Sequence, residues 1–391
     1  MKKLIALISA VMLTLSCLSA GVFAVGPGTV TIDAGTGIGA AYDEDAMPIA
    51  GTVYNGGSIE GITPDQTIYL KIMGAQLLNS NDLSDGATIN DSNVLADDDY
   101  FKLKVKKDGD GRRLIDEVSQ VSEKKDANGN RCGWLKIVIA PSDMTDEQKA
   151  ELRLTFTAKE DNEDGGWSED DFATVELDLW INNPLEKGDD YDAEPGDQFV
   201  YQPVSNENNE LTWDDVAILK FTADDDASKF YARLSTKADK SVYQNYPDAE
   251  LYFRNFSGNP NISTTSRATL ILLNPWMQDD SVLVNPKSCH IYTKDSDGVL
   301  SDVTSLFTYL ETDEEGNEVN GWRIKTRMLG SYVISNIELE TDTESEPSDS
   351  VQPETVESAG ILETMDVSPD LQSETDSITN NTKPNPPTGK N

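Results

Sequence analysis

The chain has 391 residues, with 70 Asp and Glu against 31 Lys and Arg, so its formal charge is −39 at pH 7. A nucleic-acid-binding protein needs a basic surface to neutralise phosphates, so this charge excludes nucleic acid as a partner and argues against attraction to anionic lipid. Apolar residues make up only 37% of the chain, yet its six tryptophans can still fill hydrophobic cores. The length predicts about two domains of ordinary size together with non-globular segments.

The N-terminus carries the pattern of a secretory signal. Met1-Lys2-Lys3 is followed by an apolar run over 4–18 and then by Val22-Phe23-Ala24, which gives a charged start, a short apolar middle and a small-residue exit. The run is shorter than the roughly 20 residues of a membrane anchor, so we expect cleavage after Ala24 and no membrane insertion of the mature chain. This start resembles bacterial signal peptides, which implies a bacterial cell surface or medium.

From Gly26 to Glu340 the dominant signal is alternation of apolar and polar residues with a period of two. Such alternation is typical of half-buried strands in antiparallel sheets, and turn-forming pairs such as Asn55-Gly56 separate the segments. The sequence therefore predicts an all-β protein with two antiparallel β-sandwich domains, Ig-like or jelly-roll-like. The predicted strands are 29–33, 67–72, 101–106, 135–139, 152–157, 175–179, 216–221, 230–234, 250–253, 269–273, 322–326 and 332–337.

Two local motifs in the first domain carry further predictions. Thr145-Asp146-Glu147-Gln148 matches a capping box and predicts one short helical turn before the strand at Leu152. Asp108-Gly-Asp110-Gly111 partly matches a calcium loop, but Lys106 stands at the first ligand position. A hairpin turn is therefore favoured at that point.

A domain boundary is predicted where Asn, Pro, Gly and Asp residues interrupt the periodicity. We expect a first sandwich over 25–188, an acidic linker over 189–197 and a second sandwich over 198–340. The linker carboxylates could share a calcium ion that stiffens the hinge, and the alternative is a solvated acidic linker without an ion. The candidate calcium ligands are Asp189, Asp190, Asp192, Glu194 and Asp197. No other cofactor is indicated.

The chain has few residues that could serve in nucleophilic catalysis or as zinc ligands. Its single histidine is His290, and the cysteines beyond the signal segment are Cys132 and Cys289. Successive strand residues point to opposite faces, so Cys289 and His290 should not meet as a nucleophile and its base. The same residues are too few for a zinc site, and the cysteines fall in different domains, so we expect two buried free thiols. No catalytic residue is singled out.

Carboxylates are abundant, and a glycoside hydrolase needs only two of them across a cleft. The distinguishing feature would be a pair made unequal by aromatic surroundings. The candidate settings are Trp167 beside Glu169 and Asp170, and Trp213 beside Asp214 and Asp215. A tryptophan equally suits a sandwich core or a sugar-stacking platform, so a structural adhesin predicts buried aromatics and a sugar-binding face predicts exposed ones.

The composition changes from Thr341 onward. Aromatic residues are absent there, Ser, Thr and Pro are frequent, and acidic residues recur. Such a segment cannot bury enough apolar area to offset the entropy lost on ordering it. We therefore expect a disordered acidic stalk over 341–391.

The stalk ends in Asn385-Pro386-Pro387-Thr388-Gly389, which resembles the LPXTG-type sorting motif that sortases cleave between Thr and Gly. A signal peptide, folded ectodomains, a polar spacer and this motif occur in that order in such proteins, which implies a wall-anchored protein of a Gram-positive bacterium. Two departures are that Asn385 replaces Leu and that no apolar segment and basic tail follow Gly389. Two interpretations stay open: a chain truncated at its C-terminus, or a Pro-rich tail with no anchoring role.

Four segments of the second domain, 253–260, 266–270, 302–304 and 325–335, resemble a module of uncharacterised secreted proteins of gut Firmicutes. This resemblance implies a surface protein and no particular activity. We therefore predict a non-catalytic exported protein that acts in adhesion, matrix or cell-wall display, with surface proteins, matrix proteins or glycans as partners. The alternative is a polysaccharide-binding module or a glycoside hydrolase with paired carboxylates.

Overall fold

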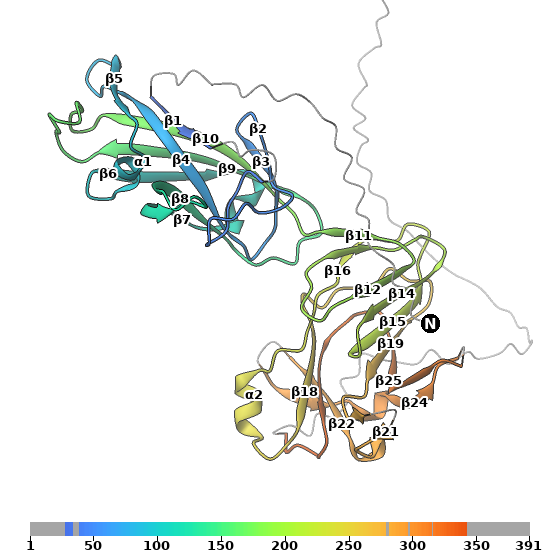
Figure 1. The fold of residues 1–391 in the computed structure, drawn as a ribbon. Helices are drawn as coiled ribbons and strands as arrows, with labels where there is room; N and C mark the ends of the chain where they lie inside the picture. Colours follow the sequence, from blue (N-terminus) through green and yellow to red (C-terminus); the bar gives the residue numbers. More distant parts are fainter. Residues whose placement is uncertain (1–27, 34–38, 279–280, 296–297, 315, 342–391) are drawn as a thin grey trace, which may run out of the picture. The chain divides into compact units, whose positions relative to one another are not determined.

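The structure is a computed structural model, and it describes residues 28–33, 39–278, 281–295, 298–314 and 316–341 (Figure 1). Strands dominate these residues, and the α-helices among them are the short α1 (Ser92–Ala96) and α2 (Lys240–Asn245). The predicted all-β fold is confirmed. No helix in these ranges has the length and apolar character needed to cross a bilayer. The signal segment with Ala24, the sorting motif Asn385–Gly389 and the stalk beyond Thr341 lie outside the described residues.

The first sandwich is built around one long strand that takes part in two sheets. β4 pairs with β8 through its first half and with β1 and β5 through its second half. β1 and β3 pair with β10 in parallel, whereas β9 pairs with β6 and β10 in antiparallel fashion. The strands are β1 (Thr29–Ile32), β2 (Val53–Asn55), β3 (Ser58–Ile62), β4 (Thr67–Leu78), β5 (Asp85–Ile89), β6 (Phe101–Asp108), β7 (Ile115–Lys125), β8 (Arg131–Ile139), β9 (Gln148–Ala158) and β10 (Phe172–Ile181).

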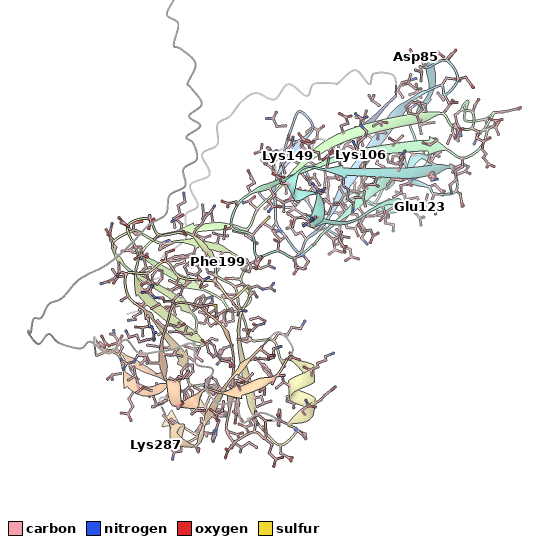
Figure 2. The ribbon with its side chains drawn as sticks, turned by 180° about the vertical axis from the view of Figure 1, so that it is seen from behind. Asp85, Lys106, Glu123, Lys149, Phe199 and Lys287 are labelled. Atoms are coloured by element: carbon pink, nitrogen blue, oxygen red, sulfur yellow. The ribbon has the colours of Figure 1, made fainter. Side chains whose placement is uncertain are left out.

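The core of the first sandwich follows from the period-two pattern. Leu152, Leu154 and Phe156 alternate along β9, and all three are buried in one apolar cluster with Leu135 of β8. Burying each such side chain stabilises the fold by about 1.5–3 kcal/mol. The intervening polar residues face solvent, as does Lys106 on β6, which is labelled in Figure 2.

The second sandwich packs a six-stranded sheet against a five-stranded one. Their orders are β12-β14-β15-β19-β25-β24 and β17-β18-β26-β22-β23. Trp213 and Trp322 of the first sheet share a buried core with Phe256 and Ile334 of the second. The strands are β11 (Leu185–Lys187), β12 (Asp190–Ala193), β13 (Val200–Gln202), β14 (Asn208–Trp213), β15 (Ala217–Thr222), β16 (Phe230–Tyr231), β17 (Leu234–Ser235), β18 (Leu251–Phe256), β19 (Ala268–Leu273), β20 (Met277–Gln278), β21 (Ser281–Val282), β22 (His290–Lys294), β23 (Leu300–Asp302), β24 (Thr308–Thr312), β25 (Glu318–Thr326) and β26 (Ser331–Ser335).

The segment 189–197 was predicted to be an acidic linker, but in the structure part of it is a strand of the second sandwich. β12 lies within it and forms one edge of the six-stranded sheet, where it pairs in parallel with β14. Ala193 is buried, and Tyr191 packs against the core, while Asp190 and Asp192 are exposed. This alternation spans only four residues, and its high charge conceals it in the sequence.

Two turn predictions are wrong. The segment 145–147 is not helical, because β9 begins at Gln148 and its ladder with β10 takes the chain into an extended conformation. The connection after Asp108 is not a hairpin, since β6 pairs with β9 whereas β7 pairs with β8. A short 3₁₀ helix (Asp110–Leu114) makes this connection, and Gly111 lies so close to β9 that an added Cβ would be 2.9 Å from a backbone carbonyl carbon.

Candidate functional site

The outer face of the six-stranded sheet in the second sandwich is hollowed by a groove of about 430 Å³, which we call the outer-sheet groove. Directly paired strand residues share a face, so the register places side chains in rows across this sheet. One row that lines the groove runs through Asp190, Glu210, Lys220, Thr269 and Lys325, from β12 to β25. It is acidic at the β12 edge and basic at β25.

The next row gives the groove an apolar floor beside a charged wall. Ile218, Ile271 and Arg323 pair in succession across β15, β19 and β25. Ile271 is only 1% exposed although it lies on the outer face, and both Ile271 and Leu310 line the groove. The groove therefore combines a small apolar patch with charged side chains held on paired strands.

Lys220 is the central cation of the groove. Its Nζ lies 3.2 Å from Glu210 Oε2 and 3.0 Å from Asp313 Oδ2. Burial alone would lower the pKa of Lys220, but hydrogen bonds to Asp313 and Glu210 outweigh burial and raise that pKa above its ordinary value. Lys220 is therefore held as a charged ammonium, which cannot act as a nucleophile or a base.

The other cations of the groove are more loosely held. Arg323 contacts Glu314 at 3.1 Å, but Glu314 is 81% exposed, so this pair contributes little stability. Lys325 donates a hydrogen bond to the Thr269 hydroxyl. Within the described residues, neither Lys325 nor Arg267 has a carboxylate partner, and both are exposed.

The predicted calcium ligands do not converge on one point. Asp189 and Asp190 line one end of the groove, and Asp192 projects from the same face of β12 one row further on. Glu194 and Asp197 belong to the following turn, in which Asp197 Oδ2 accepts a hydrogen bond from the Glu194 amide at 3.0 Å. These five side chains therefore belong partly to the groove and partly to a turn.

A different acidic group meets the distance requirement of a metal ion. A metal site needs several ligand atoms close together. In the part of the chain that the structure describes, Asp97, Asp98 and Asp99 form the one group in which three carboxylate oxygens, one from each residue, lie within 4.8 Å of one another. Asp98 and Asp99 are exposed, so water screens their repulsion, and Asp97 Oδ1 accepts a hydrogen bond from the Asp99 amide at 2.9 Å. This cluster has the character of a hydrogen-bonded surface turn.

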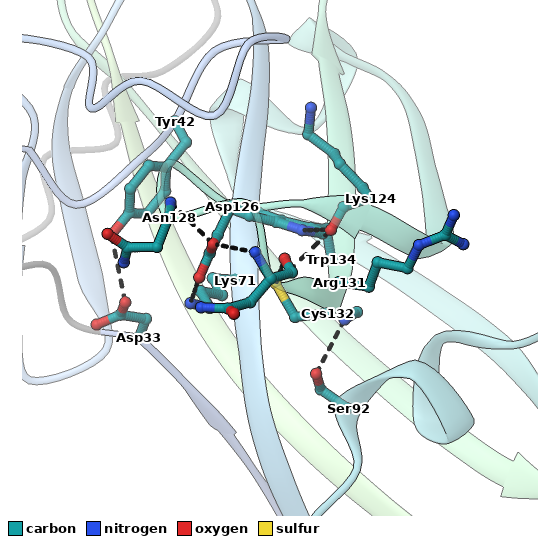
Figure 3. Close-up of polar contacts among 12 residues, drawn as sticks. Asp33, Tyr42, Lys71, Ser92, Lys124, Asp126, Asn128, Arg131, Cys132 and Trp134 are labelled. Atoms are coloured by element: carbon teal, nitrogen blue, oxygen red, sulfur yellow. Dashed lines mark hydrogen bonds and ion pairs between the residues drawn. The ribbon is translucent and has the colours of Figure 1, made fainter.

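A second polar cluster lies in the first sandwich, where β4 meets the hairpin formed by β7 and β8 (Figure 3). Lys71 Nζ lies 2.8 Å from Asp126 Oδ2, and the Asp126 side chain is only 8% exposed. Asp126 Oδ1 accepts hydrogen bonds from the amides of Asn128 at 3.0 Å and Asn130 at 2.9 Å. The hydrogen bond from Lys71 is the main cause that lowers the pKa of Asp126.

Aromatic rings and a thiol complete this cluster (Figure 3). The Tyr42 hydroxyl donates to Asp33 Oδ2 at 3.2 Å, and burial together with Asp33 raises the pKa of Tyr42 to about 12. The Tyr42 ring meets the buried Trp134 ring edge-on, with 5.2 Å between their centroids. Burial raises the pKa of Cys132, so its sulfur stays a thiol. The cluster joins the 39–52 loop to β4 and β8, and it offers no activated nucleophile.

The histidine and cysteine predictions are confirmed in their geometry. Cys132 and Cys289 are both free and buried. Cys289 is 3% exposed, and burial raises its pKa to about 11, whereas the neighbouring His290 is half-buried with Nδ1 3.5 Å from Asp302 Oδ2. The two neighbours lie in different surroundings, and Cys289 ends a 3₁₀ helix directly before β22 begins at His290.

The two tryptophan settings for a catalytic carboxylate pair are core positions. Trp213 is fully buried and donates to the Ala232 carbonyl at 3.2 Å, while Asp214 and Asp215 lie in an exposed turn. Trp167 is 7% exposed and packs on Phe101, with 5.4 Å between ring centroids. Five of the six tryptophans are buried, and the sixth, Trp180, is half-buried.

The chain matches no protein-family model and no curated protein sequence. The groove therefore has to be interpreted from its own residues. Sequence analysis did not single out Lys220, Arg267, Arg323 or Lys325. Three of them occupy polar positions of alternating strands, and Arg267 immediately precedes β19. The available signal in the sequence was that basic residues are scarce among so many acidic ones. Only the order of the strands shows that these four basic residues line one groove.

Proposed function

We propose that this chain is an exported bacterial surface protein that acts without catalysis, in adhesion or cell-wall display, and that the outer-sheet groove contacts its ligand. The observation that carries this proposal is a groove of about 430 Å³ in which charged side chains from neighbouring strands of one sheet and from the adjoining loops face one another. Sites of roughly 300–1,000 Å³ suit small ligands or single units of a polymer. Side chains on paired strands are also held more precisely than side chains on loops.

The carboxylates of the groove support binding over hydrolysis. A glycoside hydrolase needs one protonated and one ionised carboxyl group placed on either side of the scissile bond. Glu210 and Asp313 instead share the ammonium of Lys220, at 3.2 and 3.0 Å. Two carboxylates that share one ammonium form a fixed electrostatic framework, and they are not a pair placed on either side of a scissile bond.

The proposal of surface display draws on the two ends of the sequence. A signal pattern with cleavage after Ala24 supports export, and the Ser, Thr and Pro content of 341–391 suits an extended spacer. The Asn385–Gly389 motif supports attachment to the wall of a Gram-positive bacterium. On this proposal the partners are surface proteins, matrix proteins or glycans, and the strong negative charge keeps the displayed chain soluble.

The experiment is binding of the purified chain to isolated cell walls and to host-cell surfaces, compared with a variant that fills the groove. Ser266 lines the groove and is exposed, so Ser266→Trp should block it without disturbing the core. Ser281→Trp, on the exposed strand β21, is the matched control. We expect Ser266→Trp to weaken binding by about tenfold or more and the control to bind like wild type.

Two results would overturn the proposal. Equal binding by Ser266→Trp and wild type would show that the groove does not contact the ligand. Release of new reducing ends from wall polysaccharide during long incubation would establish the hydrolase alternative.

A further inference from the structure

We infer that the outer-sheet groove binds an acidic saccharide, that is, a sugar unit bearing a carboxylate or sulfate group within a longer glycan. This inference rests on the proposed binding function of the same groove and adds the chemical class of its ligand. Its basis is the set of cations that the sheet brings together, along with the surroundings that those cations face.

The first step concerns the uncompensated cations. Acidic residues outnumber basic ones by 70 to 31 in the chain, yet four basic side chains line this one groove. Lys220 and Arg323 have carboxylate neighbours in Glu210 and Glu314. Arg267 and Lys325 line the same groove and have none in the described part of the chain. An anionic group of a ligand would supply the missing partner through charge-assisted hydrogen bonds.

The second step concerns what the groove lacks as a site for neutral sugars. Neutral sugars are commonly held by stacking on exposed aromatic rings. The aromatic residue in the lining of the groove is Phe221, which is 6% exposed and belongs to the core. Recognition in this groove must therefore come from hydrogen bonds and charge, with the C–H groups of a sugar against the half-buried Leu310.

The third step concerns the acidic end of the groove. Asp189 and Asp190 line it together with Asn208, and their oxygens can accept hydrogen bonds from sugar hydroxyl groups. A ligand that carries hydroxyl groups at one end and an anionic group at the other matches the change from acidic to basic along the row. Inorganic phosphate or a simple carboxylate would leave the acidic end without a partner.

The net charge of −39 does not prevent this binding. Exposed charges separated by more than about 8 Å are largely screened at physiological ionic strength. The affinity is then set by the groups that line the groove. Glu210, Asp313 and Glu314 are already paired there with Lys220 or Arg323, so Arg267 and Lys325 are left to meet the anionic group.

The test measures binding of three saccharides to the full chain by calorimetry, with EDTA present so that divalent cations cannot bridge. The probes are a short oligogalacturonate, the same oligosaccharide with its carboxylates reduced to alcohols, and a sulfated oligosaccharide without carboxylates. The groove variant is Arg267→Gln with Lys325→Gln. The matched control is Lys240→Gln with Lys287→Gln, which removes two exposed lysines of the same sandwich that do not line the groove; Lys287 is labelled in Figure 2.

We expect an acidic oligosaccharide to bind, its carboxyl-reduced form to bind at least about tenfold more weakly, and the groove variant to lose a similar factor. The control should stay within about twofold of wild type, because its charges are remote and screened. Binding by the uronate or by the sulfated probe identifies which anionic group the groove prefers. In either case, the variant must lose the binding.

The inference is overturned if the uronate binds and its carboxyl-reduced form binds equally well, or if the groove variant binds the acidic probes as the control does. It is also overturned if no saccharide binds. Should Ser266→Trp still abolish attachment to cell surfaces in that last case, the proposed function stands and only the ligand class fails. If Ser266→Trp has no effect either, both the inference and the proposed function are wrong.

Discussion

Replacing Asp126 by Asn should destabilise the first sandwich by about 2–3 kcal/mol at neutral pH. Removing one partner of a fully buried ion pair costs about 3–5 kcal/mol, because it leaves an uncompensated charge. The Lys71 side chain is 20% exposed, so water reaches its ammonium and reduces that cost. The amide oxygen of the introduced asparagine can still accept from the Asn128 and Asn130 amides, so the loss falls on the contact with Lys71.

The pH dependence of this effect has a definite sign. The pKa of Asp126 is lowered in the folded state from its ordinary value of 3.8, so folding favours the ionised carboxylate. Its contribution to stability is therefore fully present above the unfolded pKa and is lost as the pH falls through the lower folded pKa. The difference between wild type and Asp126→Asn should shrink steadily as the pH falls from about 5 toward 2.

Hydrogen exchange followed by mass spectrometry is the appropriate assay, because it reports local stability within the full chain. Peptides from β7 and β8 should lose protection in Asp126→Asn, and peptides from the second sandwich serve as an internal control. Lys71→Met alone and combined with Asp126→Asn completes a double-mutant cycle, with an expected coupling energy of about 1–3 kcal/mol. A loss below about 0.5 kcal/mol, or one that stays constant down to pH 2, would refute the ion-pair argument.

Three further predictions concern packing, thiol reactivity and calcium. Gly133→Ala should destabilise the first sandwich by about 1–3 kcal/mol in urea unfolding, because its Cβ would lie 2.0 Å from the Ser92 carbonyl oxygen; wild-type stability would contradict this. Cys132 and Cys289 should resist alkylation in the folded chain at pH 8 and react after unfolding, as intact-mass measurement would show, because both thiols are buried with raised pKa values. Calcium should leave the melting temperature unchanged, because the five predicted ligands diverge; a rise that EDTA reverses would restore the calcium hypothesis.

The strands were predictable from the sequence because burial imposes a period of two on each of them separately. Leu152, Leu154 and Phe156 show this on β9, where every second side chain enters the core. The capping box at 145–148 failed because a local hydrogen-bonding preference was outweighed by the long ladder between β9 and β10. Local patterns therefore predicted elements correctly where the tertiary pairing agreed with them.

The groove could not be predicted because its residues become neighbours only through strand order. Glu210 and Lys220 are close in the sequence, but Lys325 joins their row through β19, which the chain reaches much later. Sequence reasoning placed Asp190 in a linker because charge was its most visible property. The decisive property was its position opposite Glu210 in a parallel pair, which charge does not reveal.

The position of β12 gives the acidic residues of this segment a role that does not require calcium. An edge strand exposes unpaired backbone groups, and charged side chains on it discourage pairing with another chain. Asp190 and Asp192 project from the outer face of this edge, so their repulsion would oppose the approach of a second such edge. The same Asp190 also forms the acidic end of the groove. Protection of the edge and the acidic end of the groove thus both come from the outward-facing carboxylates of one short strand.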